Sequence, residues 1–89
     1  MHDYKSLENE LKSVVDSVAQ DLKNKAQVRQ INELIDEHAE YGVAYDLLCY
    51  LILNEELKIS PDIYERIVEL GKQMKMEEDS WLPLAVLIQ

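Results

Sequence analysis

The feature that most constrains the fold of this chain is an apolar run from Val43 to Leu53, interrupted only by Asp46. A helix that crosses a bilayer needs about 20 apolar residues, so this run is too short to span a membrane. A helix that is apolar nearly all round is usually buried among other elements. The run therefore predicts a central packing helix, and the sequence predicts no membrane span.

The rest of the chain contains few residues that would interrupt helices. Only two glycines and two prolines occur among 89 residues, and straight-chain residues dominate, which favours helices joined by short connections. A chain of this length makes one domain. We therefore expect a single all-α domain over residues 1–89, a bundle of four to five antiparallel helices. Apolar periodicity places these helices at about residues 3–22, 26–39, 41–55, 61–74 and 79–88.

Individual residues indicate how these helices begin, end and approach one another. Ser60 followed by Pro61 predicts a capped helix start, and Gly42 suits the tight turn before the third helix. Gly71 lies within a predicted helix, where it costs about 1 kcal/mol relative to alanine. Close approach of another helix would explain it. Glu55 falls on the core side at a helix end, so we expect it to accept hydrogen bonds from the backbone of a neighbouring turn.

Two residues invite a chemical interpretation but do not support one. His38 has Leu34, Ile35, Tyr41 and Gly42 at helical spacing, whereas a helical metal site needs a carboxylate or a second histidine there. We expect His38 on the inner face of its helix as a structural residue. Cys49 is the only cysteine, and its apolar surroundings predict a buried thiol. The sequence thus indicates no metal site and no cofactor.

Charge is the most informative part of the composition. The net charge is −9, and residues 30–57 carry seven acids without any lysine or arginine. Nucleic acid and anionic membranes both require a basic surface, so direct binding to either is disfavoured. A basic protein is the natural complement of such a surface, although acidity can also serve solubility alone. The N-terminal stretch has no features of a signal peptide, and we expect a cytoplasmic protein.

A known family shares the order of motifs along residues 31–88. These motifs are the stretch 40–44 (EYGVA), Leu47, Cys49, Ile52, Glu55, the pair 59–60 (IS), Tyr64, Ile67 and the stretch 81–84 (WLPL). With them the chain resembles the MafI family of immunity proteins, which protect bacteria from polymorphic toxins, including those of contact-dependent growth inhibition. The resemblance implies a helical inhibitor of a cognate toxin C-terminal domain, commonly a basic nuclease, with a ribonuclease favoured.

The candidate binding residues combine the acidic stretch with tyrosines, which often anchor interfaces. They comprise Asp36, Glu37, Glu40, Tyr41, Asp46 and Tyr50. Asp46 and Tyr50 lie on the second face of the third helix, with Cys49 and Leu53. That face either packs in the core or forms an exposed binding strip. If Asp36, Glu37 and Glu40 do not bind the partner, the next candidates are three acids of the fourth helix, Asp62, Glu65 and Glu69.

Other classes of function fit the sequence less well. Nucleophilic triads, phosphate-binding loops and metal-ligand sets are all absent from the sequence, so we do not expect an enzyme. The alternative to an immunity protein is a generic acidic helical adaptor or regulator that binds a protein partner or dimerises. A dimer would use the apolar second face of the third helix. We expect the chain to be a monomer or a weak dimer.

Overall fold

The computed structural model describes residues 4–89, and the side chain of Tyr4 lies outside the described part. Four α-helices form the body: α1 (Tyr4–Ala19), α2 (Lys25–Asp36), α3 (Tyr41–Asn54) and α4 (Pro61–Gln73). Two short 3₁₀ segments follow, η1 (Glu78–Ser80) and η2 (Leu82–Leu87). The described residues form no strand, although an isolated bridge joins Ile59 to Ile88. The predicted all-α fold is confirmed.

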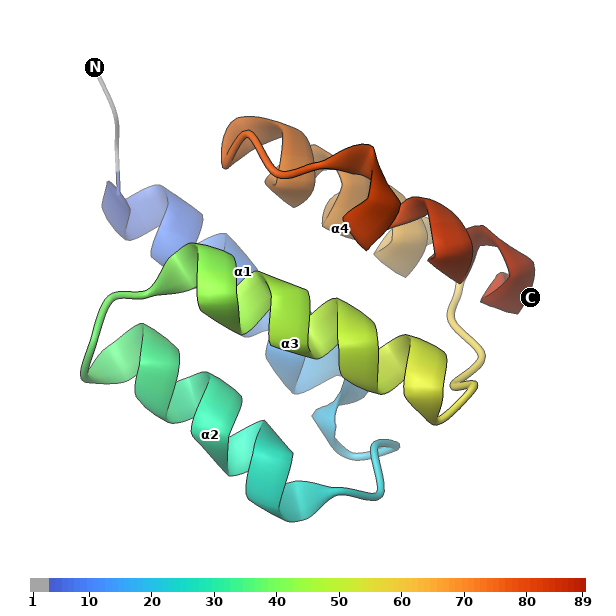
Figure 1. Cartoon of the computed structure of the whole chain (residues 1–89), viewed down its shortest axis with the longest axis horizontal. Helices are drawn as coiled ribbons and strands as arrows, with labels where there is room; N and C mark the ends of the chain where they lie inside the picture. Colours follow the sequence, from blue (N-terminus) through green and yellow to red (C-terminus); the bar gives the residue numbers. More distant parts are fainter. Residues whose placement is uncertain (1–3) are drawn as a thin grey trace.

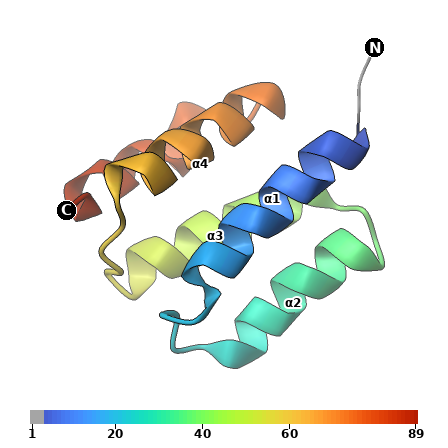
Figure 2. The ribbon, with the colours of Figure 1, turned by 180° about the vertical axis from the view of Figure 1, so that it is seen from behind.

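Helix α3 runs through the middle of the molecule. Figure 1 shows α2 on one side of α3, α4 with the C-terminal segment on the other, and α1 behind it. The reverse view in Figure 2 has α1 in front, between α2 and α4. Packing follows this arrangement, since α3 contacts α1, α2 and η2, and α1 also contacts α4. The predicted central helix is therefore confirmed.

The last predicted helix is the part of the fold that differs most from expectation. Residues 79–88 do not form one α-helix, and most of them belong to the two 3₁₀ segments η1 and η2. Pro83 is at the start of η2 and has no N–H to donate, so it cannot continue an α-helix from η1. Trp81, Leu84 and Leu87 are nevertheless buried, so this segment still closes the core. The predicted start of the first helix at Asp3 lies outside the described residues.

Helix ends follow local sequence in some places and not in others. The Ser60 hydroxyl accepts a hydrogen bond from Ile63 N–H with Pro61 at the first position, as expected. Gly42 does not form the turn, because α3 already begins at Tyr41 and the residue with a positive φ is Ala39, at 51°. Helix α2 accordingly ends at Asp36. His38 lies in the turn and is exposed, so its predicted inward position was wrong.

The largest fully buried side chain among the described residues is one that the periodicity of α3 did not single out. Tyr45 is fully buried, and its hydroxyl donates a 2.7 Å hydrogen bond to the Ile67 carbonyl of α4. Gly71 is buried directly beside it, and a Cβ at Gly71 would overlap the Tyr45 hydroxyl and the Trp81 ring. The close approach predicted from Gly71 is thus confirmed. The approaching groups are a tyrosine of α3 and a tryptophan between η1 and η2.

Glu55 also has its predicted role. Its two carboxylate oxygens accept hydrogen bonds from the backbone N–H groups of Lys23 (2.6 Å) and Asn24 (3.0 Å) in the α1–α2 connection. These bonds, first that from Lys23, lower the pKa of Glu55. The carboxylate therefore fixes the connection against the C-terminal end of α3.

Candidate protein-binding surface

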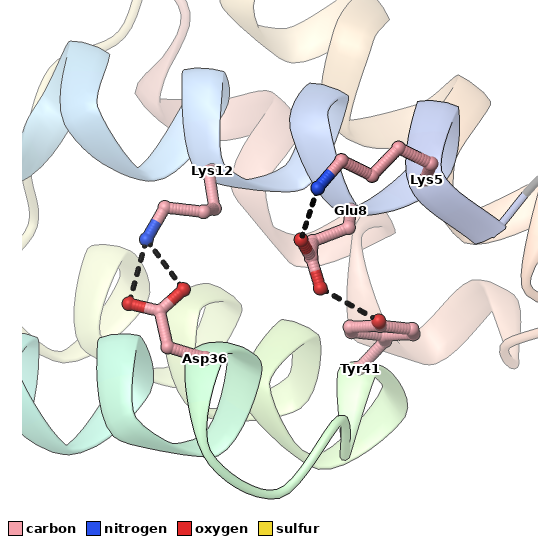
Figure 3. A network of polar contacts seen from close by, with 5 residues as sticks. All are labelled: Lys5, Glu8, Lys12, Asp36 and Tyr41. Carbon is pink, nitrogen blue, oxygen red and sulfur yellow. Dashed lines mark hydrogen bonds and ion pairs between the residues drawn. The ribbon is translucent and has the colours of Figure 1, made fainter.

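The six predicted binding residues do not share one environment. Asp36, at the end of α2, accepts two hydrogen bonds from the Lys12 ammonium of α1, at 2.7 and 2.8 Å (Figure 3). The Asp36 side chain is 49% exposed, so this ion pair is partly screened by water. Its charge is nevertheless matched within the chain, and Asp36 holds α2 against α1.

Tyr41 is likewise engaged within the molecule. Its hydroxyl donates a 2.8 Å hydrogen bond to the Glu8 carboxylate of α1, and its ring packs against the core. Figure 3 shows Glu8 between Tyr41 and Lys5, whose ammonium is 4.0 Å from the other carboxylate oxygen. The hydrogen bond to Glu8 raises the pKa of Tyr41, with burial and the Glu8 charge adding to the effect. Tyr41 therefore fixes the start of α3.

Asp46 forms a third internal contact, at the other side of α3. Its carboxylate accepts a 2.9 Å hydrogen bond from the Ser80 hydroxyl of η1. The residue as a whole remains exposed. Asp46 thus links α3 to the C-terminal segment while leaving carboxylate surface open to solvent.

Glu37, Glu40 and Tyr50 are the predicted residues that remain free to bind a partner. All three are exposed, Tyr50 by 57%, and within residues 4–89 none of their side chains forms a hydrogen bond or an ion pair. Glu37 and Glu40 lie together in the turn between α2 and α3. Tyr50 lies ten residues after Glu40, on α3, a separation of about 15 Å along the helix at 1.5 Å per residue. The acidic turn and Tyr50 are therefore separate parts of the surface.

A second acidic area lies in a groove between α1 and α4. Glu10, Asp62, Glu65 and Glu69 line it together with Arg66. The Arg66 guanidinium donates to Glu10 at 2.9 Å and to the Ser13 hydroxyl at 2.8 Å, which leaves the three acids of α4 without an ion pair among the described residues. The sequence placed these three acids outward. It could not show the groove, because the facing residues come from a helix more than 50 positions away.

A third candidate surface is apolar and lies on the second face of α3. This face is partly packed in the core and partly exposed: Cys49 is buried, whereas Tyr50 and Leu53 are exposed. Burial raises the pKa of the Cys49 thiol to about 12, so the thiol stays protonated and unreactive at neutral pH. The prediction of a buried thiol is confirmed. Leu82 and Val86 of η2, which the sequence did not single out, are also exposed.

Within residues 4–89, no group of three potential ligand side chains is placed to hold a metal ion. Over the same range, none of the helices combines the length and apolar character needed to cross a membrane. Comparison with known proteins finds no matching family model, no similar curated protein and no similar solved structure.

Proposed function

We propose that this chain is an immunity protein that binds and neutralises a cognate bacterial toxin domain, most simply a basic nuclease. One observation carries the proposal: Glu37 and Glu40 are exposed and form no ion pair with any described residue, in a chain of net charge −9. A nuclease needs a basic surface to hold phosphate groups. An acidic inhibitor is attracted to that surface and competes with nucleic acid for it. The resemblance to MafI immunity proteins supports the same reading.

The internal contacts of the turn give Asp36 and Tyr41 a supporting part in this proposal. The Lys12–Asp36 ion pair holds the end of α2, and the Tyr41–Glu8 hydrogen bond holds the start of α3. Glu37 and Glu40 lie between these two anchors. Because the turn is fixed at both ends, little conformational freedom is left to lose when a partner binds. Asp36 and Tyr41 thus position the turn, and Glu37 with Glu40 contacts the partner.

The test compares two double variants that change the charge equally. Glu37→Lys/Glu40→Lys reverses the turn, whereas Asp16→Lys/Asp21→Lys reverses two exposed acids of the α1 region. The probe is the C-terminal domain encoded by the open reading frame directly upstream of this chain, which we expect to be a long secreted protein ending in a basic domain. We expect the wild type and the α1 variant to protect cells that express this domain. The turn variant should lose protection, with an association rate lower by about tenfold or more.

Two results would count against this proposal in different ways. Protection by both double variants would place the binding surface elsewhere, and Asp62, Glu65 and Glu69 would be reversed next. Failure of the wild type to bind the toxin domain would refute the immunity function. Circular dichroism melting of each variant separates either result from loss of fold.

A second candidate function is favoured by a different observation. The exposed apolar area on α3 and η2 suits an acidic helical adaptor that dimerises or binds another protein. Salt separates the two candidates, because steering by acids weakens as salt rises, whereas apolar contacts do not depend on it in this way.

A further inference from the structure

Three exposed large hydrophobic side chains lie along one strip of α3, which we call the apolar face. They are Val43, Tyr50 and Leu53, and they are between 40% and 57% exposed. The segment η2 packs against α3, lies beside it in Figure 1 and carries the 78% exposed Val86, whereas Leu82 of η2 lines a hollow against α4. Single exposed apolar residues are normal in proteins. Several along one strip of a helix are typical of an interaction surface.

The spacing along α3 resembles that of a helix that pairs with another helix. Exposed residues recur at Val43, Asp46, Tyr50 and Leu53, and steps of three, four and three residues are those of the inner positions of a coiled coil. The one acid of this row, Asp46, uses one carboxylate oxygen for the Ser80 hydroxyl. A carboxylate can accept about four hydrogen bonds, so Asp46 retains acceptor capacity at the centre of the face.

The row is also symmetric in its chemistry. In two antiparallel helices related by a twofold axis, positions equally far from the axis on opposite sides face each other. With the axis beside residue 48, Val43 meets Leu53 of the second copy, and Asp46 meets Tyr50 of the second copy. The first pairing is apolar with apolar, and the second joins a hydroxyl donor to a carboxylate acceptor. By symmetry, each pairing occurs twice.

We propose that the apolar face binds a second copy of this chain in an antiparallel twofold dimer. Tyr50 of each copy donates its hydroxyl to Asp46 of the other, and Val43 packs on Leu53 at both ends. The proposal is independent of toxin binding, since it concerns the purified chain alone.

Charge around the face is mixed and gives no uniformly acidic surface for a highly basic partner. Lys75 and Glu40 line the same hollow as Val43 at one end. Asp46 is the one charged residue in the row itself, and the exposed Glu78 and Asp79 of η1 precede its partner Ser80. A second copy matches the row in both apolar and polar positions.

The test uses opposite charges at one exposed position. Tyr50→Glu places a carboxylate opposite Asp46 of the other copy, and Tyr50→Lys places an ammonium there. Asn9→Glu is the matched control, because it adds a negative charge to an exposed residue of α1. Sedimentation equilibrium from micromolar to near-millimolar concentration measures the dimer dissociation constant of each. Circular dichroism melting checks that each variant folds.

We expect the wild type, Asn9→Glu and Tyr50→Lys to dimerise. Tyr50→Glu should weaken the dimer by at least about tenfold, because like charges across an interface are strongly unfavourable. Equal weakening by Tyr50→Glu and Tyr50→Lys would refute the pairing of Asp46 with Tyr50. A wild type that stays monomeric over the whole range would refute the dimer and assign the apolar face to a different protein.

Discussion

The Glu55 carboxylate accepts from two consecutive backbone N–H groups, and its protonation should therefore affect stability. These bonds hold the pKa of Glu55 below its ordinary value of 4.5. A group with a lowered folded pKa stabilises the protein above its unfolded pKa, and this contribution is lost as pH falls through the folded pKa. We predict that Glu55→Gln melts at a lower temperature than the wild type at pH 7, and that the difference shrinks below about pH 4.5.

The control for this prediction is the neighbouring residue. Glu56→Gln makes the same change at an exposed side chain that has no hydrogen bond or ion pair within the described residues. Its melting temperature should stay close to that of the wild type at both pH values. A difference between Glu55→Gln and wild type that stays constant from pH 7 to pH 3 would show that the charge of Glu55 is not what holds the α1–α2 connection.

At the scale of helices, the two glycines are predicted to respond oppositely to alanine. Both lie within helices, Gly42 in α3 and Gly71 in α4. At Gly71 a Cβ would overlap the Tyr45 hydroxyl and the Trp81 ring, whereas at Gly42 it would make an ordinary contact with Met76 at 3.6 Å. We expect Gly71→Ala to lower the free energy of unfolding by about 1–3 kcal/mol. Gly42→Ala should leave it unchanged or raise it by up to about 1 kcal/mol.

Urea unfolding of the two variants provides the measurement, and each serves as the control for the other. Alanine is the better helix former at both positions, so propensity alone predicts stabilisation in both. An increase in stability for Gly71→Ala would show that α4 can shift away from Tyr45 and Trp81 at little cost.

How much of the fold is predictable from sequence depends on the range of the contacts involved. The helix start at Ser60 and Pro61 depends only on neighbouring residues. A glycine within a helix, Gly71, and a carboxylate on the core side of a helix, Glu55, are each unfavourable locally, so each indicates a tertiary contact. All were predicted correctly. The burial of Tyr45 depends on which carbonyl of α4 it meets, and periodicity alone did not place it. The predicted end of α2 was wrong, because Ala39 adopts a positive φ that alanine ordinarily avoids.

The candidate site was less predictable because charge pairing occurs across the whole molecule. Residues 30–57 contain no lysine or arginine, which made the segment appear uniformly acidic in sequence. The fold places Lys12 on Asp36 and brings Lys23 and Lys25 close to Glu55. The acids of this segment that stay exposed without a hydrogen bond or an ion pair among the described residues are Glu33, Glu37, Glu40 and Glu56.

The whole molecule therefore has two proposed modes of association, and salt should act on them in opposite directions. Toxin binding joins an acidic surface to a basic one, and screening weakens their attraction. Dimerisation joins two copies that each carry −9, and screening weakens their repulsion. The Debye length is about 10 Å at 0.1 M salt and about 3 Å at 1 M.

We predict that rising sodium chloride slows association with the toxin domain and tightens the dimer. Stopped-flow fluorescence of the single tryptophan, Trp81, can follow the first process, and sedimentation equilibrium can follow the second. Tyr50→Glu serves as the control: its residual self-association should increase with salt more steeply than that of the wild type, because each copy then carries one more negative charge at the face. A dimer that weakens as salt rises would show that ion pairs, rather than the apolar face, hold the two copies together.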